Sequence, residues 1–236
     1  DKAFAGGKGR EVEAKDFVYS IKRLADPKLQ SLGWWLLDGK ISGLNEWRKK
    51  YSDKKVADYT EKIEGLQTLD KYTVQFKLKK SFPQFLYALA MPFTFVVAEE
   101  AVKTYGKEFL NHPVGTGPFV LPMFNQSNKI VYKRNPKFRK KLFPSDMSKE
   151  FKTPELMSYA GKELPILDKI TVHIMTEPQP RWLKFLKGRL DFISIPKDNF
   201  DSVITPSQGL VDDMAKKGIK LMVSPSLDVT YVAFNH

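Results

Sequence analysis

Histidine and cysteine are the side chains most often used for acid–base chemistry, nucleophilic attack or transition-metal binding, and this sequence has three histidines and no cysteine. His112 precedes a proline at the expected end of a helix, His173 lies inside an expected strand and His236 is the last residue. None of them belongs to an H-E-x-x-H helix or accompanies a G-x-S-x-G nucleophile turn. The sequence therefore predicts no catalytic residue, no metal site and no cofactor, and it indicates that the protein is not an enzyme.

Two acidic pairs and two glycine-rich segments are the other candidates for chemistry. Glu99-Glu100 and Asp212-Asp213 fall at expected helix ends, where carboxylates interact with the helix dipole, so they are not interpreted as an acid/base pair. Gly6-Gly7-Lys8-Gly9 lacks the spacing of a phosphate-binding loop, and Gly115-Thr116-Gly117-Pro118 leads into a strand instead of a helix. Neither segment predicts a nucleotide site.

Trp34 and Trp35 are the side chains best suited to lining a ligand pocket, since large rings beside glycines supply contact area at a low cost in conformational entropy. The alternative is that one or both close a hydrophobic core, because tryptophan is highly buried on average. Adjacent residues cannot both face the same side, so we expect the two rings to have different surroundings.

The net charge of +12 raises the question of a polyanionic partner. Lysines are scattered among acids along the chain, and the densest runs, Arg48 to Lys50 and Lys137 to Lys141, contain only a few charges each. This distribution indicates an ordinary solvated basic surface and no nucleic-acid partner. The most apolar stretch, Phe85 to Ala98, is too short to cross a bilayer and is interrupted by Pro92.

Hydrophobic periodicity predicts the elements that position these residues. Phe17, Val18, Ile21 and Leu24 share one face of a helix that ends before Pro27. Strict alternation from Tyr72 to Leu78 predicts a hairpin with Leu66 to Leu69. Further elements are expected at Leu44–Tyr51, Pro83–Ala90 and Glu99–Leu110 (helices) and at Phe119–Leu121 with Ile130–Arg134 (a second hairpin).

The second half of the chain follows a different pattern. A long irregular loop is expected from Pro136 to Pro165, followed by an alternation of strands and helices that predicts an α/β layer with some parallel pairing. The expected elements are strand Ile170–Met175, helix Pro178–Lys187, strand Leu190–Ile195, helix Asp198–Lys217, strand Ile219–Val223 and a final strand Val229–Asn235. Because that last strand ends with the chain, it indicates truncation. The two α/β lobes are expected to meet near His112 to Gly117.

Six segments carry a family resemblance. Gly9 to Pro27 is similar to a signature helix written G-x-x-V-T-A-x-D-V-x-x-S-x-x-R, and Asn111 to Phe119, followed by Arg134-Asn135-Pro136, is similar to P-V-G-T-G-P-[YF] with its R-N-P-x-[YF] sequel. Leu167 to Ile170, Gly188 to Asp191 and Tyr231 to Asn235 resemble the L-D-x-I, G-x-[IL]-D and Y-[LI]-x-F-N segments. Together they resemble the extracellular solute-binding proteins of family 5, which include the oligopeptide- and dipeptide-binding proteins of ABC importers.

One position departs from the signature helix. Glu13 stands where the family usually has threonine, which removes a hydroxyl helix cap. We therefore expect a weaker start to this helix, without an effect on function.

The resemblance implies a fold and an architecture. The fold is α/β and periplasmic-binding-protein-like, of type II and the peptide-binding subclass, with two α/β lobes belonging to a larger three-domain receptor. Residues 1–112 would be a small α/β domain with the signature helix and a hairpin, and residues 113–236 the incomplete α/β portion of the first ligand-binding lobe. The family's N-terminal strands and second large lobe are absent from this sequence.

The resemblance also implies a function and a site. The protein would be the monomeric, periplasmic or extracytoplasmic receptor that captures a peptide and delivers it to an ABC permease in the inner membrane. The residues expected near the ligand, the lobe junction or the hinge are Trp34, Trp35, Gly115, Thr116, Gly117, Tyr231, Phe234 and Asn235. A structural alternative stays open for the glycines, since a turn can require unusual backbone angles, and for Asn235, which could satisfy strand-end groups.

Two alternatives remain for the function. The same receptor fold also binds non-peptide solutes such as nickel complexes or sugars. A basic nucleic-acid-binding protein is the alternative from another class, and it would show binding that falls steeply with salt.

Overall fold

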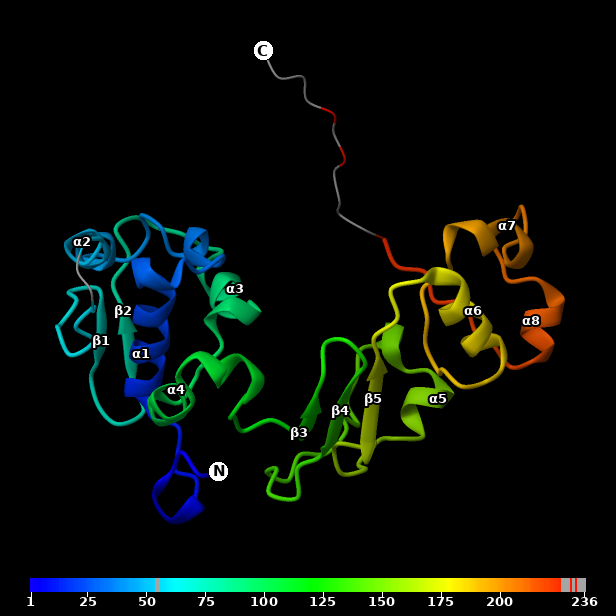
Figure 1. Ribbon diagram of the computed structural model, residues 1–236, viewed down its shortest axis with the longest axis horizontal. Helices are drawn as coiled ribbons and strands as arrows, with labels where there is room; N and C mark the ends of the chain where they lie inside the picture. The colour runs from blue at the N-terminus through cyan, green and yellow to red at the C-terminus, as the bar shows by residue number, and fades with distance from the viewer. Residues whose placement is uncertain (54–55, 226–229, 231, 233–236) are drawn as a thin grey trace. The chain divides into compact units, whose positions relative to one another are not determined.

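The computed structural model describes residues 1–53, 56–225, 230 and 232. These residues form two compact units, Asp1–Asn125 with Ile130–Val172 and Gln126–Lys129 with His173–His236. The α-helices are α1 Ala14–Ala25, α2 Leu44–Lys50, α3 Phe85–Leu89, α4 Glu99–Tyr105, α5 Pro154–Met157, α6 Pro178–Leu186, α7 Phe200–Val203 and α8 Asp212–Lys216. The strands are β1 Leu66–Thr68, β2 Val74–Phe76, β3 Phe119–Phe124, β4 Lys129–Arg134 and β5 Lys169–His173 (Figure 1). Short 3₁₀ helices lie at Ala5–Gly7, Pro27–Leu29, Trp34–Leu36, Pro92–Thr94, Gly106–Asn111, Lys149–Phe151 and Lys197–Asn199.

Helix α1 lies against the β1–β2 hairpin in the first unit (Figure 1). Its apolar stripe, which includes Ile21, Leu24 and Ala25, is buried in a cluster to which α2, β1 and α3 also contribute. Leu37, Ile41 and Leu44 are fully buried in the same cluster. The predicted helix and hairpin are therefore confirmed, because the burial follows the periodicity that the sequence shows.

The start of α1 is secured from within the helix. The backbone N–H of Glu13 donates to the carboxylate of Asp16 (2.8 Å), which is one half of a capping box. This bond engages the backbone N–H of residue 13, whereas the hydroxyl of the family's threonine would accept from an N–H group of the first turn, so Asp16 does not replace the threonine. The C-terminal end is marked by Asp26, whose carboxylate accepts from the N–H of Lys28 as the chain turns into the next helix.

The hairpin β1–β2 has one bonded edge and one open edge. The strands are antiparallel, with Leu66 opposite Phe76 and Thr68 opposite Val74. The N–H of Leu69 donates to Thr73 O and the N–H of Lys77 donates to Gly65 O, so the odd-numbered residues of β2 face β1. The backbone N–H and C=O of Val74 and Phe76 point the other way, and within the described chain they have no backbone partner.

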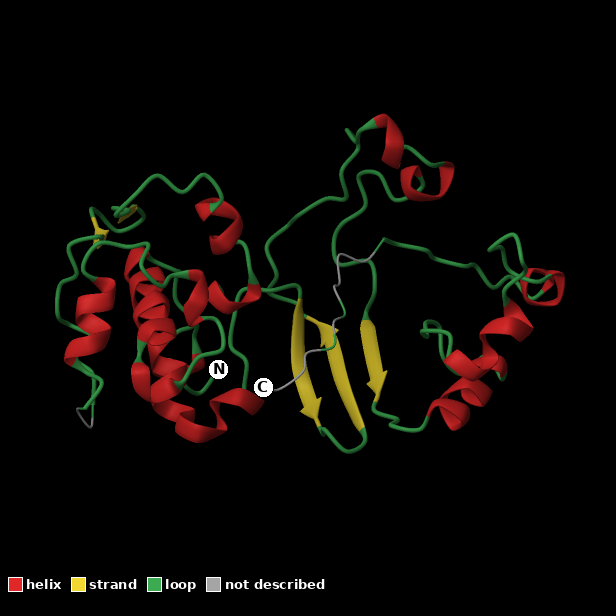
Figure 2. Cartoon of the chain, turned by 90° about the horizontal axis from the view of Figure 1, so that it is seen from above, coloured by secondary structure: helices red, strands yellow, loops and turns green. Residues whose placement is uncertain are grey.

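The second sheet of the first unit has the order β3-β4-β5 (Figure 2). β3 and β4 form the predicted second hairpin and are antiparallel, with Phe119 opposite Arg134 and Phe124 opposite Ile130. Backbone bonds from Arg134 N to Asp168 O and from Ile174 N to Asn128 O show that β5 is also antiparallel to β4. The sheet ends at the segment from Asn135 to Asp168, which is mostly irregular, as predicted, but contains α5.

The prediction of a parallel layer is wrong for two of its strands. Leu190–Ile195 and Ile219–Val223 form no strand, and Phe192, Met222 and Val223 are 75–81% exposed. A strand needs a neighbouring ladder for its backbone groups, and no described segment pairs with either stretch. The expected helix Asp198–Lys217 is divided into α7 and α8, because Pro206 and Gly209 lie between them. The predicted strand Val229–Asn235 lies outside the described residues except for two positions.

The second unit is organised around α6. Trp182 is buried and its ring stacks on Phe185, with 5.6 Å between centroids. Val203 of α7 is also buried. The confirmed helix α6 therefore carries the main apolar contacts that the structure describes in this unit.

No helix in the described residues is long and apolar enough to cross a membrane.

Candidate ligand-binding site

Three of the segments that the sequence singles out meet at one end of the β3-β4-β5 sheet. The N–H of Asn135 donates to Pro118 O (2.8 Å) and its side-chain amide donates to Gly117 O (2.9 Å). Arg134 donates from its backbone to Asp168 O (2.8 Å) and from its guanidinium to Ile166 O (3.1 Å). We call this meeting point the motif junction, made of Gly117, Pro118, Arg134, Asn135, Ile166 and Asp168.

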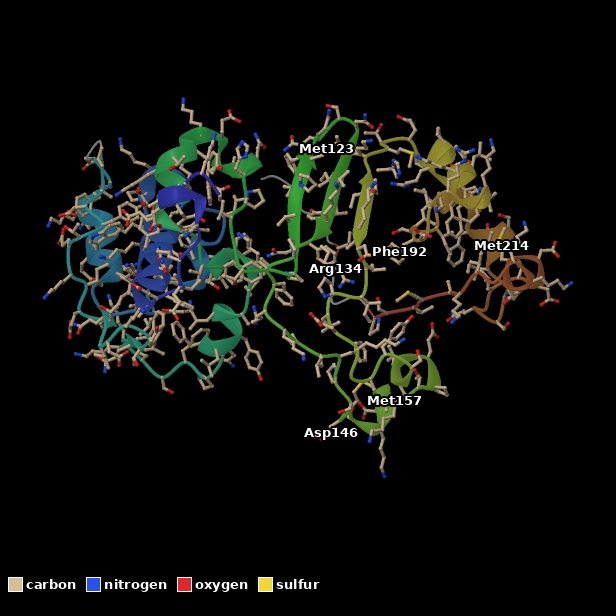
Figure 3. The ribbon with its side chains drawn as sticks, turned by 90° about the horizontal axis from the view of Figure 1, so that it is seen from below. Met123, Arg134, Asp146, Met157, Phe192 and Met214 are labelled. Atoms are coloured by element: carbon tan, nitrogen blue, oxygen red, sulfur yellow. The ribbon has the colours of Figure 1, made fainter. Side chains whose placement is uncertain are left out.

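The motif junction is held mainly by backbone groups. Arg134 also forms an ion pair with Asp168 (3.0 Å), but the aspartate side chain is 88% exposed, and exposed pairs contribute little to stability. Figure 3 places Arg134 at the end of the sheet opposite Met123. The strand register therefore positions the junction, because Arg134 is directly opposite Phe119.

The turn Gly115-Thr116-Gly117 is exposed to solvent beside the motif junction. All three residues are exposed, and a β-carbon added to either glycine would meet no atom within 4 Å. Neither glycine has a positive φ, so the alternative that this turn requires unusual backbone angles is wrong. In the described chain the N–H groups of these three residues have no hydrogen-bond partner, which leaves three donors free for another molecule.

The two tryptophans have different surroundings, as predicted. Trp34 is partly buried against the core cluster, and the guanidinium of Arg48 lies over its ring at 4.7 Å. Arg48 is itself fixed by a bond to Ala25 O (2.8 Å). Trp35 is 60% exposed. Trp34 therefore has a packing role, whereas Trp35 remains available for a ligand.

The tryptophan pair and the glycine turn are not joined by any hydrogen bond or ring contact within the described residues. Tyr231, Phe234 and Asn235 lie outside those residues. Three residues of the motif junction lie in segments that carry the family resemblance but were not predicted as site residues: Arg134, Asn135 and Asp168. Their hydrogen bonds to distant segments depend on strand register, which the sequence pattern did not give.

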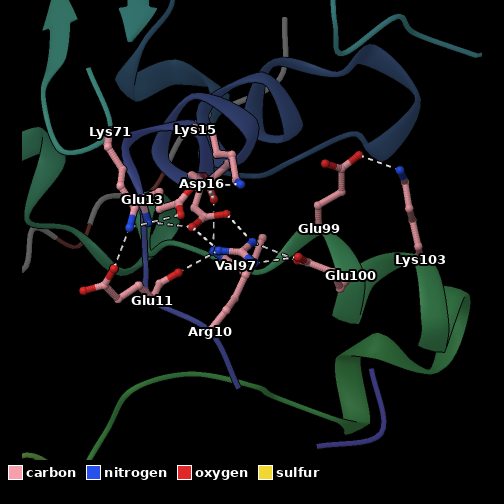
Figure 4. Close-up of polar contacts among 11 residues, drawn as sticks. Arg10, Glu11, Glu13, Lys15, Asp16, Lys71, Val97, Glu99, Glu100 and Lys103 are labelled. Atoms are coloured by element: carbon pink, nitrogen blue, oxygen red, sulfur yellow. Dashed lines mark hydrogen bonds and ion pairs between the residues drawn. The ribbon is translucent and has the colours of Figure 1, made fainter. Parts of the chain in front are cut away.

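A salt-bridged network fixes the signature helix to α4 (Figure 4). Arg10 donates two hydrogen bonds to Asp16 (2.7 and 2.8 Å) and two to Glu100 (2.6 and 2.8 Å). Asp16 is only 3% exposed. Burial raises the pKa of the Asp16 carboxyl, but hydrogen bonds from Arg10 and from the Glu13 N–H outweigh it, so the pKa lies below its usual value. The hydrogen bond from Arg10 also lowers the pKa of Glu100.

The network continues through the helix to the neighbouring segment. Ser20 donates to Asp16 O (2.7 Å) and accepts from the N–H of Val97 (2.9 Å). The two contacts of the buried Ser20 satisfy its hydroxyl between α1 and the residues before α4. We assign the network a structural role, since its charges are paired with one another.

An apolar cavity of about 290 Å³ lies in the same unit. It is lined by Phe17, Ile21, Tyr72, Val74, Phe76, Leu89 and Thr94. The hydroxyl of Thr94 donates its one hydrogen toward Leu89 O and Met91 O, so it has no donor left for a ligand. The lining suits an apolar group and lacks the convergent polar groups of a specific solute site.

The remaining titratable candidates have structural surroundings. His112 stacks on Tyr105 (4.4 Å between ring centroids), and His173 contacts Lys184 (3.2 Å). The described residues contain no group of three or more histidine or acidic side chains arranged to hold a metal ion.

Comparison with known proteins supplies the family. The family model "Bacterial extracellular solute-binding proteins, family 5 Middle" matches residues 7–236. The glutathione-binding protein GsiB of Escherichia coli O6 is 29% identical over 174 residues, which are 73% of this chain and 28% of that protein. The GsiB of Salmonella typhi is 27% identical over the same length.

Solved structures agree on the fold. Burkholderia pseudomallei OppA matches with a TM-score of 0.59 and 22% identity, covering 82% of this chain and 33% of its own. The Escherichia coli murein tripeptide binding protein MppA matches with a TM-score of 0.59, 24% identity and the same coverage. The chain thus spans about a third or less of the length of these relatives. With a family model matched over nearly all of its residues, this chain belongs to the family 5 bacterial extracellular solute-binding proteins.

Proposed function

We propose that this chain is part of the substrate-binding component of a bacterial ABC transporter that captures extracytoplasmic peptides and delivers them to the membrane permease. The family match over residues 7–236 is the observation that carries the proposal. The protein would act as a monomer in the periplasm or outside the cell, without catalysis and without a nucleic-acid partner.

The open glycine turn supports a peptide as the solute. Peptide main chains are recognised through backbone hydrogen bonds, with side chains left in roomy pockets. Gly115, Thr116 and Gly117 offer free N–H donors next to a junction held by Asn135. Such donors suit the carbonyl oxygens of an extended peptide. Exposed Trp35 is the candidate for a hydrophobic wall beside the solute.

The relatives narrow the range of solutes worth testing. GsiB is named for glutathione, a short peptide with a free thiol, and MppA for a murein tripeptide. We therefore propose short peptides as the class, with glutathione among the candidates. Three residues remain proposed for the hinge side of the site: Tyr231, Phe234 and Asn235. The domain boundary between residues 112 and 113 also remains a proposal.

The test is native mass spectrometry of the protein expressed from its complete gene, before and after unfolding and refolding. We expect discrete mass losses that correspond to peptides, and the refolded protein should bind di- and tripeptides or glutathione from a defined panel. A refolded protein that no peptide shifts, but that a nickel complex or a sugar does, would contradict the peptide assignment while leaving the receptor class intact.

A further inference from the structure

The segment from Lys129 to Lys141 is the densest run of positive charge in the chain. It contains seven basic residues and no acidic one: Lys129, Lys133, Arg134, Lys137, Arg139, Lys140 and Lys141. The strand β4 carries the first three, and the others follow directly after the motif junction. We call residues 137–142 the basic segment.

The charges of the basic segment are largely uncompensated. Arg134, just before it, is paired with Asp168. Lys137, Lys140 and Lys141 are exposed, and no carboxylate of the described chain lies within ion-pair distance of them. The three lysines are one to four positions apart in the chain. The distances between their charges are therefore comparable to the screening length at physiological salt, so the charges act together on a charged partner.

The basic segment is fixed to a second segment of the fold. Leu164 N donates to Lys141 O and Phe143 N donates to Lys162 O, both at 2.8 Å. Leu142 bridges to Glu163 between these bonds. The pairing adds the cation of Lys162 to the surface, and it also adds one carboxylate, that of Glu163.

Each of the two paired stretches carries or leads to an exposed aliphatic side chain. Leu142 is 48% exposed, and Leu167, three residues beyond Leu164, is 58% exposed. Cations interleaved with exposed aliphatic side chains are the pattern of proteins that bind the surface of anionic membranes. Single-stranded nucleic acid favours exposed aromatic rings for base stacking, but the one aromatic ring of the segment, Phe138, is covered by the guanidinium of Arg139 at 5.0 Å.

We propose that the basic segment, together with Leu142 and Leu167, is a docking surface for an anionic lipid bilayer. The cations would lie against lipid phosphates, and the two leucines would insert between the headgroups. The partner is the membrane surface itself, so the inference does not depend on which solute the protein binds. It would concentrate the protein at the membrane surface.

The test measures co-sedimentation of the protein, made from its complete gene, with lipid vesicles. We expect binding to phosphatidylcholine vesicles that contain one quarter phosphatidylglycerol, weak binding to pure phosphatidylcholine, and a loss of binding at high salt. The triple variant K137E/K140E/K141E should bind more than about a hundredfold more weakly, because it removes about 1 kcal/mol of attraction for each lysine and adds repulsion from each glutamate. The variant L142S/L167S should also bind more weakly, but should keep its salt dependence.

The matched control is K8E/K28E/K107E, which changes the net charge by the same amount at three exposed lysines elsewhere. It should bind nearly as well as the wild type, and thermal melts should show that all variants are folded. Equal losses for the control and the K137E/K140E/K141E variant would mean that net charge alone is responsible, which overturns the proposal. Absence of binding to anionic vesicles, or binding to single-stranded DNA that exceeds vesicle binding, overturns it as well.

Discussion

The side-chain amide of Asn135 donates a 2.9 Å hydrogen bond to the carbonyl oxygen of Gly117, eighteen residues earlier in the chain. The bond links the end of β4 to the turn that leads into β3. The backbone of Asn135 makes a second bond to Pro118, so this residue holds the open turn from two sides. The position of the three free N–H donors therefore depends on it.

Substituting Asn135→Ala removes two side-chain hydrogen bonds, one donated to Gly117 O and one accepted from the Lys137 N–H. It should destabilise the protein by about 1–2 kcal/mol. It should also weaken solute binding, because the turn loses the hydrogen bond that Asn135 donates to Gly117 O. Urea unfolding and calorimetric titration with the identified solute would measure the two effects. Asn111→Ala is the matched control, since its side chain bonds only to the neighbouring exposed Glu108, and it should leave the affinity unchanged.

Substituting Gly117→Ala should not change stability, because the φ angle is ordinary and a β-carbon there meets no atom. Affinity for the solute should fall, since a methyl group would stand beside the free donors. Gly218→Ala provides the contrast: its φ is +75°, so it should cost about 1 kcal/mol with no effect on affinity. An unchanged affinity in Gly117→Ala would remove the turn from the proposed site.

Substitutions of the two tryptophans should have different effects on stability and on solute affinity. Trp34→Ala should lower stability by about 2–4 kcal/mol, since it removes core packing and the partner of Arg48. Trp35→Ala should change stability by less than about 0.5 kcal/mol, because its ring is mostly exposed. If Trp35 lines the pocket, its variant will lose solute affinity while its melting temperature stays near that of the wild type.

The charge network should make stability fall in acid. The pKa values of Asp16 and Glu100 are lowered in the folded protein, so their contribution is present above the unfolded pKa values of about 4 and is lost as the pH falls through the folded ones. Urea midpoints between neutral pH and about pH 3 should show this decline. The variant Asp16→Asn should be less stable by about 2 kcal/mol at neutral pH and should show a flatter pH dependence.

Two neighbouring glutamates offer a matched control for this network. Glu100→Gln should cost about 1 kcal/mol, because it removes a charged partner of Arg10. Glu99→Gln affects only an exposed pair with Lys103 one helical turn away, and should cost less than about 0.5 kcal/mol. Equal effects of the two substitutions would contradict a special role for the network.

The isolated chain of residues 1–236 should bind the solute more weakly than the protein from its complete gene. A receptor that closes on its ligand gains affinity from contacts on both sides of the cleft, and this chain spans about a third of the length of the solved relatives. Parallel titrations of both proteins would measure the difference. Equal affinities would place the complete site within these residues.

Local patterns predicted the first unit well. The helix at Ala14–Ala25 and both hairpins follow from periodicity, since their buried faces repeat at the expected spacing. The departure at Glu13 was expected to weaken the start of this helix, and that expectation stays a prediction, because the bond from the Glu13 N–H goes to Asp16, an aspartate that the signature already contains.

The second unit was predicted less well, for a physical reason. The stretches around Phe192 and Met222 contain enough apolar residues to read as strands, but a strand is stabilised by its partner and not by its own composition. The same limit applied at the motif junction. The sequence identified the segments around Gly117, Asn135 and Asp168 but not their contacts, because contacts between distant segments follow from strand register.

The open edge of β2 has a practical consequence for anyone who prepares residues 1–236 alone. Val74 and Phe76 present unpaired backbone groups, and their side chains line an apolar cavity. Such an edge is a template on which a strand from a second molecule can pair, which is how aggregates begin. The neighbouring lysines Lys71 and Lys77 are ion-paired with Glu11 and Glu64, so they leave little net charge at this edge to repel a second strand. Concentrated preparations of residues 1–236 should therefore self-associate with little dependence on salt, which size-exclusion chromatography over a range of protein and salt concentrations would measure.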